Sequence, residues 1–249
     1  MQKDNIITVL VSVILSVVVS VALCATISGS NPAPAASASA QDMNKTIEDY
    51  LMNNPTKVRE SLVLAEQKEQ EEAERRIAEL YKSNWKDLSS YEGSPYVGPK
   101  DADIVIVEFF DFNCGYCKRL APELMKVIKN NPDVKVVFKP VTFLGSMPIA
   151  KAAMAANKQG KFLEVYEALL THNGQITTSV IDDIIKKAGL DVAKTKKLMD
   201  SSEIAEEIAD IAELSQKVQI RGVPTLIING EALPAIDSAS IQNAIDNLK

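Results

Sequence analysis

The pattern of apolar and polar positions begins with an uncharged apolar run from residue 6 to 27, IITVLVSVILSVVVSVALCATI. A run of this length matches the ~20 apolar residues that a membrane-spanning helix needs, and it is long for the apolar core of a signal peptide. We therefore expect residues 1–27 to be a signal peptide or a membrane anchor. Either one would export the chain to a compartment where disulfides persist.

A linker is predicted at residues 28–41, which are rich in Pro, Ala and Ser and offer little to bury. Ala38-Ser39-Ala40 fits a small-residue cleavage site, but it lies well beyond the apolar run, so an uncleaved anchor remains open. Cys24 lies inside the apolar run after the bulky Leu23, which does not suit lipidation. We interpret Cys24 as a small apolar side chain of that run.

Residues 42–92 predict a highly charged helical extension. Apolar side chains recur at helical spacing in two short faces, which Asn53-Asn54-Pro55 separates. These faces comprise Met43, Ile47, Tyr50 and Leu51, then Val58, Leu62, Ala65, Ala73, Ile77 and Leu80. So thin a stripe cannot form a core alone. It either packs on the rest of the chain, remains a solvated spacer, or pairs with copies of itself through residues 42–90.

Residues 93–249 predict an α/β domain. Gly93-Ser94-Pro95 marks its start, and strand and helix patterns alternate after it. We expect strands at 104–110, 134–139 and 225–228, a helix at 114–129 that Pro122 bends, several helices at about 146–219, and a last helix at 241–248. This order predicts a mixed sheet that a helical insertion interrupts.

Composition narrows the classes of partner. A net charge of -6 offers no surface to neutralise phosphates, so we expect no nucleic-acid partner. Three cysteines and one histidine, His172, are too few for a structural zinc site, so we expect no metal in a single chain. An oligomer could still capture copper or zinc between its CxxC pairs. We assign His172, which lies near a predicted helix end, no role.

Cys114-Gly115-Tyr116-Cys117 is the strongest candidate for chemistry. Cysteines at i and i+3 in the first turn of a helix lie on one face, within the Cα separation of ~4.4–6.8 Å that a disulfide requires. The helix amino terminus favours an anion at Cys114, so we expect this thiol to ionise readily and Cys117 to be the shielded resolving thiol. The pair would form a redox-active disulfide, and no other cofactor is expected.

Glu108 is an acid inside an otherwise apolar strand, six residues before Cys114. A buried carboxylate needs a partner or a task, and at this position it could lie beneath the cysteines and shuttle the proton of Cys117. Two alternatives remain open for Glu108. It could reach solvent at the edge of the sheet, or it could form an ion pair with Lys139.

Val223-Pro224 precedes a predicted buried strand and follows Arg221-Gly222. A proline cannot donate to a sheet, and an X-Pro bond is where a cis peptide costs least. If this bond is cis, it would expose the backbone of Val223 to a substrate strand. The alternative is an ordinary proline that begins a strand.

Two segments, EFFDFNCGYCKRLAPEL and RGVPTLIING, resemble the active site and the cis-proline loop of the DsbA-like thioredoxin-fold oxidoreductases of the bacterial envelope. The resemblance covers about residues 93–249. Residues 44–92, including DYLMNNPTKV, resemble the amino-terminal extension of a subgroup that includes the ScsC proteins, some of which assemble through it. Together, the two resemblances imply an α/β thioredoxin fold with an inserted helical domain, preceded by a charged helical extension.

The same resemblance implies Cys114 as nucleophile, Cys117 as resolving thiol, Glu108 as buried acid and Pro224 as the cis-proline. It leaves the direction of the reaction open. Gly115-Tyr116 is the dipeptide of the disulfide isomerase DsbC, whereas Val223 before the proline is typical of oxidases. Because position 116 is not His, which would stabilise the thiolate, we expect a milder oxidant than a strong DsbA oxidase.

The expected function is an exported enzyme that forms, reduces or isomerises disulfides in cysteine-containing envelope proteins and exchanges electrons with a membrane redox partner. We expect it in the periplasm or cell envelope, secreted or tethered to the inner membrane by residues 6–27. A homo-oligomer through residues 42–90 would favour isomerase or reductase action. The alternative is a copper-binding or chaperone-like envelope protein that uses the CxxC as a ligand pair.

Overall fold

The computed structural model of the protein describes residues 39–234 and 237–249. The predicted signal or anchor, Cys24 and most of the predicted linker lie outside these residues. In the part described, no helix is both long enough and apolar enough to cross a membrane. The chain divides into two compact units, one up to Gln67 and one from Lys68 to Lys249, and the division falls within a long helix.

The first unit contains α2 (Ala40–Asn53) and the first part of α3 (Pro55–Ser83). The Ser39 side chain begins α2 by accepting a hydrogen bond from the Asp42 amide at 3.1 Å. Pro55 opens α3, at a position where its missing N–H leaves no helical bond unmade. α2 buries none of its side chains within the described residues, so its apolar face is exposed.

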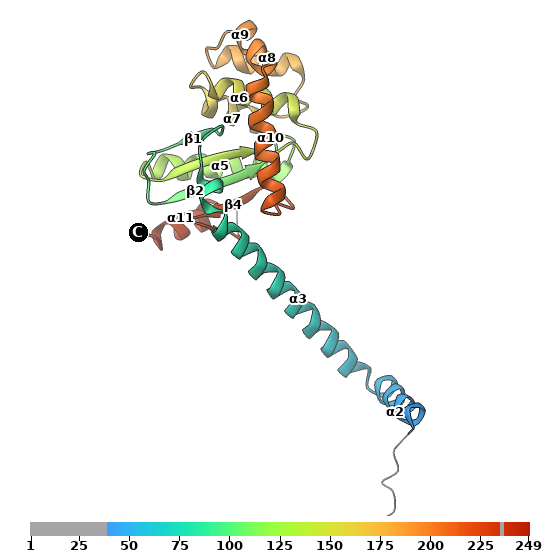
Figure 1. Cartoon of the computed structure of the whole chain (residues 1–249). Coiled ribbons are helices and arrows are strands. Elements are labelled where there is room, and N and C mark those ends of the chain that lie inside the picture. The colour runs from blue at the N-terminus through green and yellow to red at the C-terminus, as the bar shows by residue number, and fades with distance from the viewer. Residues whose placement is uncertain (1–38, 235–236) are drawn as a thin grey trace, which may run out of the picture. The chain divides into compact units, whose positions relative to one another are not determined.

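The second unit contains the three predicted strands and the predicted helices in the expected order (Figure 1). It also contains two two-residue strands that the sequence pattern did not predict. After the end of α3 come α4 (Trp85–Ser89), β1 (Tyr96–Val97), β2 (Val105–Phe110), α5 (Gly115–Asn130), β3 (Lys135–Pro140), α6 (Met147–Asn157), α7 (Phe162–Leu170), α8 (Thr178–Lys187), α9 (Val192–Met199), α10 (Ser202–Lys217), β4 (Thr225–Ile228), β5 (Glu231–Ala232) and α11 (Ser238–Asp246). Tyr81 of α3 and Leu88 of α4 are buried in this unit's core.

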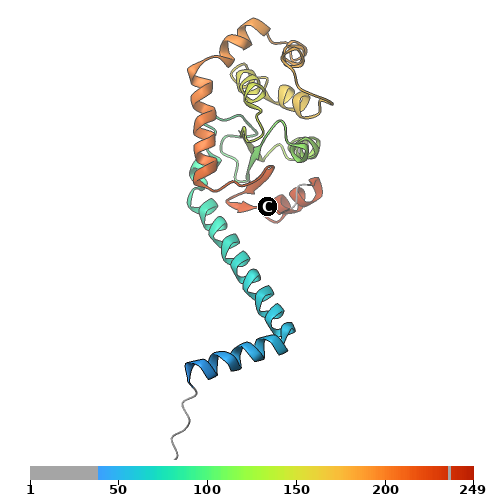
Figure 2. The same ribbon diagram turned by 90° about the vertical axis from the view of Figure 1, so that its right-hand side faces the viewer.

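The sheet has the order β1-β3-β2-β4-β5, with β2 parallel to β3 and antiparallel to β4. β2 is central and every one of its residues is buried, as its run of β-branched and aromatic residues predicts. α10 lies on one face of the sheet, while α5 and α11 lie on the other (Figure 2). The expected thioredoxin-like fold with a helical insertion is confirmed, since α6 to α10 all lie between β3 and β4.

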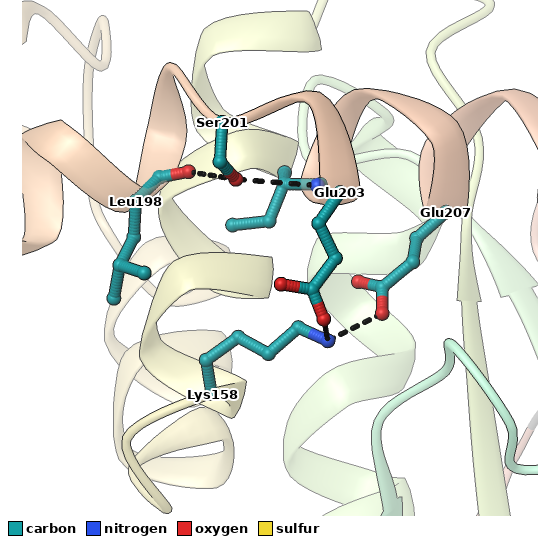
Figure 3. A network of polar contacts seen from close by, with 6 residues as sticks. Lys158, Leu198, Ser201, Glu203 and Glu207 are labelled. Carbon is teal, nitrogen blue, oxygen red and sulfur yellow. Dashed lines mark hydrogen bonds and ion pairs between the residues drawn. The ribbon is translucent and has the colours of Figure 1, made fainter.

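Within the insertion, the end of α6 is joined to α10 by a polar network (Figure 3). Lys158, just after α6, binds Glu203 at 2.6 Å and also pairs with Glu207, and both acids belong to α10. At the start of α10, Ser201 accepts a hydrogen bond from the Ile204 amide and donates one to the Leu198 carbonyl. These contacts fix where α10 begins, before it runs down to the sheet.

Candidate active site

The two cysteines occupy the start of α5. Cys114 is the residue before the helix, in an extended conformation, and its amide donates to the Asp111 carbonyl at 3.0 Å. Cys117 lies in the first turn and is fully buried, whereas Cys114 keeps 6% of its surface exposed. Both are free thiols in this structure. The two buried cysteines thus differ, since Cys114 keeps a small exposed surface and Cys117 keeps none.

Asp111 holds the loop that presents Cys114. This residue follows β2, is fully buried, and accepts hydrogen bonds from the amides of Asn113 at 2.8 Å and Leu144 at 2.9 Å. The Asn113 side chain donates to the Leu144 carbonyl at 3.0 Å. The loop before α5 is therefore tied to the loop after β3. Sequence reasoning did not single out Asp111, although an Asp two residues before an Asn in a turn is a typical local capping signal.

The Val223-Pro224 peptide bond is cis. The Cys114 thiol donates to the Val223 carbonyl, with 3.3 Å between sulfur and oxygen. Close by, the Thr225 hydroxyl donates to the Gly222 carbonyl at 2.8 Å, which closes the turn before β4. The structure therefore brings Val223 and Pro224 beside Cys114, although 109 positions separate Val223 from that cysteine in the chain.

Glu108 lies inside the protein and has a partner that the sequence did not reveal. The carboxyl group is fully buried, and the Tyr166 hydroxyl donates to it, at 2.9 Å from one oxygen and 3.2 Å from the other. Burial raises the pKa of Glu108 to about 8, and the hydrogen bond from Tyr166 acts in the opposite direction. A carboxyl group with this pKa can take up and release a proton near neutral pH.

Glu108 neither reaches solvent nor pairs with Lys139, so both of these alternatives are wrong. The carboxyl group is enclosed because β2 is central in the sheet. Lys139 donates instead to the Ser90 carbonyl at 2.8 Å and the Ser94 hydroxyl at 2.9 Å. The register accounts for this, because Glu108 is aligned with Phe138 and successive residues of a strand point to opposite faces. Lys139 therefore faces the other side of the sheet.

Cys117 is a thiol that resists ionisation. Burial raises its pKa, and a hydrogen bond with Cys114 and the nearby charge of Glu108 raise it further, while a backbone hydrogen bond with Asp111 opposes these effects. A thiol of this kind becomes a nucleophile only when a base removes its proton. Glu108 is the acid–base group whose charge acts on Cys117.

The dipeptide between the cysteines faces outward. Tyr116 is 60% exposed, and the Arg119 guanidinium lies 4.2 Å from the centre of its ring. A Cβ atom added to Gly115 would meet no other atom within 4 Å. Phe143, Leu144 and Met147 are exposed as well, and the hydrogen bond from Asn113 to Leu144 holds this apolar loop beside the start of α5.

Tyr166 is the site residue that sequence reasoning missed. It comes from α7 in the insertion, and its only signal in the sequence is a hydroxyl within an otherwise apolar helical face. No pattern connects it to Glu108, which precedes it by 58 positions. Across residues 39–234 and 237–249, no group of three or more Cys, His, Asp or Glu side chains is arranged to hold a metal ion.

Comparison with known proteins points to one family. The family model described as DSBA-like thioredoxin domain matches residues 105–246. "Disulfide bond formation protein D" of Bacillus subtilis is 28% identical over 159 residues, which cover 58% of this chain and 71% of that protein. The crystal structure of Proteus mirabilis ScsC in a transitional conformation is 28% identical, covers 84% of this chain and 95% of ScsC, and has a TM-score of 0.62.

The chain is also similar to one part of some much longer proteins. "Na(+)/H(+) antiporter NhaA 1" of Salinispora arenicola is 26% identical over 137 residues, or 53% of this chain. The matching region spans only 21% of the antiporter's length.

Proposed function

Because the chain belongs to the DSBA-like thioredoxin domain family, we propose that it is a thiol-disulfide oxidoreductase that acts on other proteins through Cys114 and Cys117. One observation carries the proposal. The sulfur of Cys114 lies at the start of α5 and 3.3 Å from the carbonyl of Val223, in front of a buried second thiol. Of the two cysteines, Cys114 is the one that keeps some exposed surface, so it is the one that exchanges with substrate.

The reducing or isomerising reaction starts from the dithiol. The Cys114 thiolate attacks a substrate disulfide, forms a mixed disulfide and releases one substrate thiolate. Cys117 then gives its proton to Glu108 and attacks the Cys114 sulfur, which forms the Cys114–Cys117 disulfide and releases the second substrate thiolate. The substrate gains two electrons and the enzyme loses two. For isomerisation, another substrate thiol attacks the mixed disulfide instead of Cys117.

The oxidising reaction is the reverse. A substrate thiolate attacks Cys114 of the disulfide form, and Cys117 leaves as a thiolate that takes a proton from Glu108. A second substrate thiolate then attacks the sulfur of the first, so that a substrate disulfide forms and the dithiol enzyme is released. The backbone at Val223 and Pro224 lies where it can align the substrate strand against Cys114, and Gly115 leaves the approach open.

The partners follow from this chemistry. The substrates are cysteine-containing proteins of the cell envelope, and a membrane redox partner returns the Cys114–Cys117 pair to its starting state. The enzyme acts in the periplasm or cell envelope, secreted or tethered by residues 6–27. The exposed apolar face of α2 supports assembly of several copies through the extension, which would present several Cys114 thiols to one misfolded substrate.

Single-cysteine variants test the chemistry. Cys117→Ser should accumulate mixed disulfides with a reduced, unfolded client protein, because no second thiol can resolve them, whereas Cys114→Ser should trap none. Non-reducing electrophoresis with and without dithiothreitol measures the trapped species. If both variants trap nothing and both lose only copper binding, the proposal is wrong and the ligand-pair alternative takes its place.

The equilibrium constant with glutathione decides the direction. At equilibrium with glutathione, a strong oxidase is mostly in its dithiol form, because it readily passes its disulfide to other thiols. A reductase is mostly in its disulfide form at the same equilibrium. We expect an intermediate value, since position 116 is not the histidine that strong oxidases of this family usually carry. Tyr116→His should shift this equilibrium toward the dithiol form.

A further inference from the structure

The buried carboxyl group of Glu108 depends on one neighbour. Among the described residues, the Tyr166 hydroxyl is the only side-chain group that donates a hydrogen bond to it. The neighbours of Glu108 in register on β3 and β4 are Phe138 and Leu226, which have no polar side-chain atoms. The titratable groups that face it are therefore Tyr166 from α7 and Cys117 from α5.

Tyr166 is held in place by aromatic packing. Its ring contacts those of Phe110, Phe138 and Phe162, with centroids 5.1, 4.9 and 5.5 Å away, and Phe112 lies beyond at 6.5 Å. The residue is fully buried. Because the ring is packed against these neighbours, its hydroxyl oxygen is held within hydrogen-bond distance of the carboxyl group.

The hydrogen bond favours the charged form of the acid. Burial raises the pKa of Glu108 and the Tyr166 hydroxyl lowers it, since a donor stabilises a carboxylate more than a neutral carboxyl group. Tyr166 itself stays protonated, because burial and the charge of Glu108 raise its pKa well above 10.0. It is therefore a fixed donor and not a proton carrier in this pair.

We propose that Tyr166 is a positioning residue for the proton transfer from Cys117, in which its hydroxyl holds the Glu108 carboxylate toward α5 and keeps it able to act as a base near neutral pH. The inference rests on the proposed function, since it concerns the step in which Cys117 attacks the mixed disulfide. In that step the Cys117 proton moves to Glu108, the Cys114–Cys117 bond forms and the bond between Cys114 and the substrate breaks.

Tyr166→Phe removes the hydroxyl and keeps the ring. Reduced protein is mixed by stopped flow with a symmetrical aromatic disulfide whose thiol absorbs visible light, between pH 5 and pH 10. The first thiol released reports the attack of Cys114, and the second reports the attack of Cys117. In Tyr166→Phe the second release should slow by about 3- to 10-fold at pH 7 and recover at higher pH, as its pH midpoint rises by about one unit. The first release should not change.

The control is Tyr81→Phe, which removes the hydroxyl of another buried tyrosine that donates no side-chain hydrogen bond to Glu108. It should leave both releases and their pH midpoints unchanged. Glu108→Gln should slow the second release and abolish its midpoint. The double variant Glu108→Gln/Tyr166→Phe should be no slower than Glu108→Gln, because the tyrosine acts only through the acid.

The possible outcomes separate the two proposals. If Glu108→Gln slows the second release but Tyr166→Phe leaves its midpoint in place, the role of Tyr166 is overturned and the oxidoreductase function stands. If the unaltered protein releases no thiol, the proposed function fails first. Should Tyr166→Phe not fold, protein labelled with 3-fluorotyrosine provides a second test, because a stronger donor must move the midpoint of the second release to lower pH. An unchanged midpoint there also overturns the inference.

Discussion

At the scale of single residues, the acid beneath the cysteines makes the protein less stable than it could be. Glu108 is fully buried, and its carboxyl group ionises only with a pKa of about 8. A carboxyl group whose pKa rises on folding costs no stability below its unfolded pKa, and it costs progressively more as the pH rises toward the folded value. An acid kept in the core at such a cost is typical of a functional group.

Glu108→Gln should therefore stabilise the reduced protein, and more so at pH 8 than at pH 5. The expected difference in this gain between the two pH values is about 3–4 kcal/mol, from the rise of the Glu108 pKa from 4.5 to about 8. Urea unfolding of the wild type and the variant at both pH values measures it. Equal effects at pH 5 and pH 8 would show that Glu108 ionises as an ordinary acid.

Gly98 is a second residue whose identity the backbone requires. It has a φ of 88°, and a Cβ atom built there would lie 2.1 Å from the Val134 carbonyl oxygen, which is backbone and cannot move aside. Gly160 also has a positive φ, of 70°, but an added Cβ would meet nothing within 4 Å. A comparison of substitutions at these two glycines therefore separates the cost of backbone strain from the cost of steric overlap.

Gly98→Ala should destabilise the protein by more than about 2 kcal/mol, because strain and overlap add, whereas Gly160→Ala should cost about 1 kcal/mol from strain alone. Thermal or urea unfolding of the two variants measures the difference. A similar loss in both would mean that the approach of Gly98 to Val134 is relieved without cost.

At the scale of elements, a few polar contacts connect α10 to the end of α6 within the insertion. Lys158 connects the end of α6 to Glu203 and Glu207 of α10 (Figure 3). The two acids differ, since the Glu203 side chain is 65% exposed and that of Glu207 only 13% exposed. One Glu207 oxygen is buried without a hydrogen-bond partner among the described residues, so this carboxylate relies on Lys158.

Lys158→Met should destabilise the protein by about 1–3 kcal/mol, because it leaves the Glu207 carboxylate largely buried with no cation. Lys161→Met, which breaks the exposed pair with Glu164, should change stability by less than about 0.5 kcal/mol. Adding Glu207→Gln to Lys158→Met should restore part of the loss in urea unfolding. A double variant as unstable as Lys158→Met would contradict this account.

At the scale of the whole molecule, the extension and the catalytic unit have different physical characters. The unit from Lys68 onward buries a large apolar core, including Tyr81 and Leu88 from its first helices. α2, in the other unit, leaves Met43, Ile47 and Leu51 about half exposed or more. Several exposed apolar side chains on one helix are typical of an interface with another chain.

If α2 joins copies of the protein, Ile47→Glu together with Leu51→Glu should convert an oligomer of the exported chain to a monomer, since the charges cannot be buried. Sedimentation velocity measures the change, and Glu48→Gln, on the same helix, serves as the control. Thiol release by Cys114 from a small aromatic disulfide should remain unchanged in the double variant. A wild type that already sediments as a monomer removes the basis for assembly through α2.

The local pattern of the sequence was enough to determine the helices and the three longer strands of the catalytic unit and the position of its two cysteines, but not the two-residue strands β1 and β5. The apolar run that became β2 and the CxxC at the start of α5 follow from periodicity and from the rules for helix ends. These depend on interactions between near neighbours in the chain, so a single sequence contains the information.

Only the tertiary structure decided which distant residues meet. Because of the strand register, Lys139 lies on the opposite face of the sheet from Glu108. The packing of α7 places the Tyr166 hydroxyl within hydrogen-bond distance of Glu108. The turn before β4 set Val223 against Cys114 in the same way. Periodicity specifies the face of an element on which a side chain lies. The partner on that face depends on how the elements pack against one another, which is a property of the whole core.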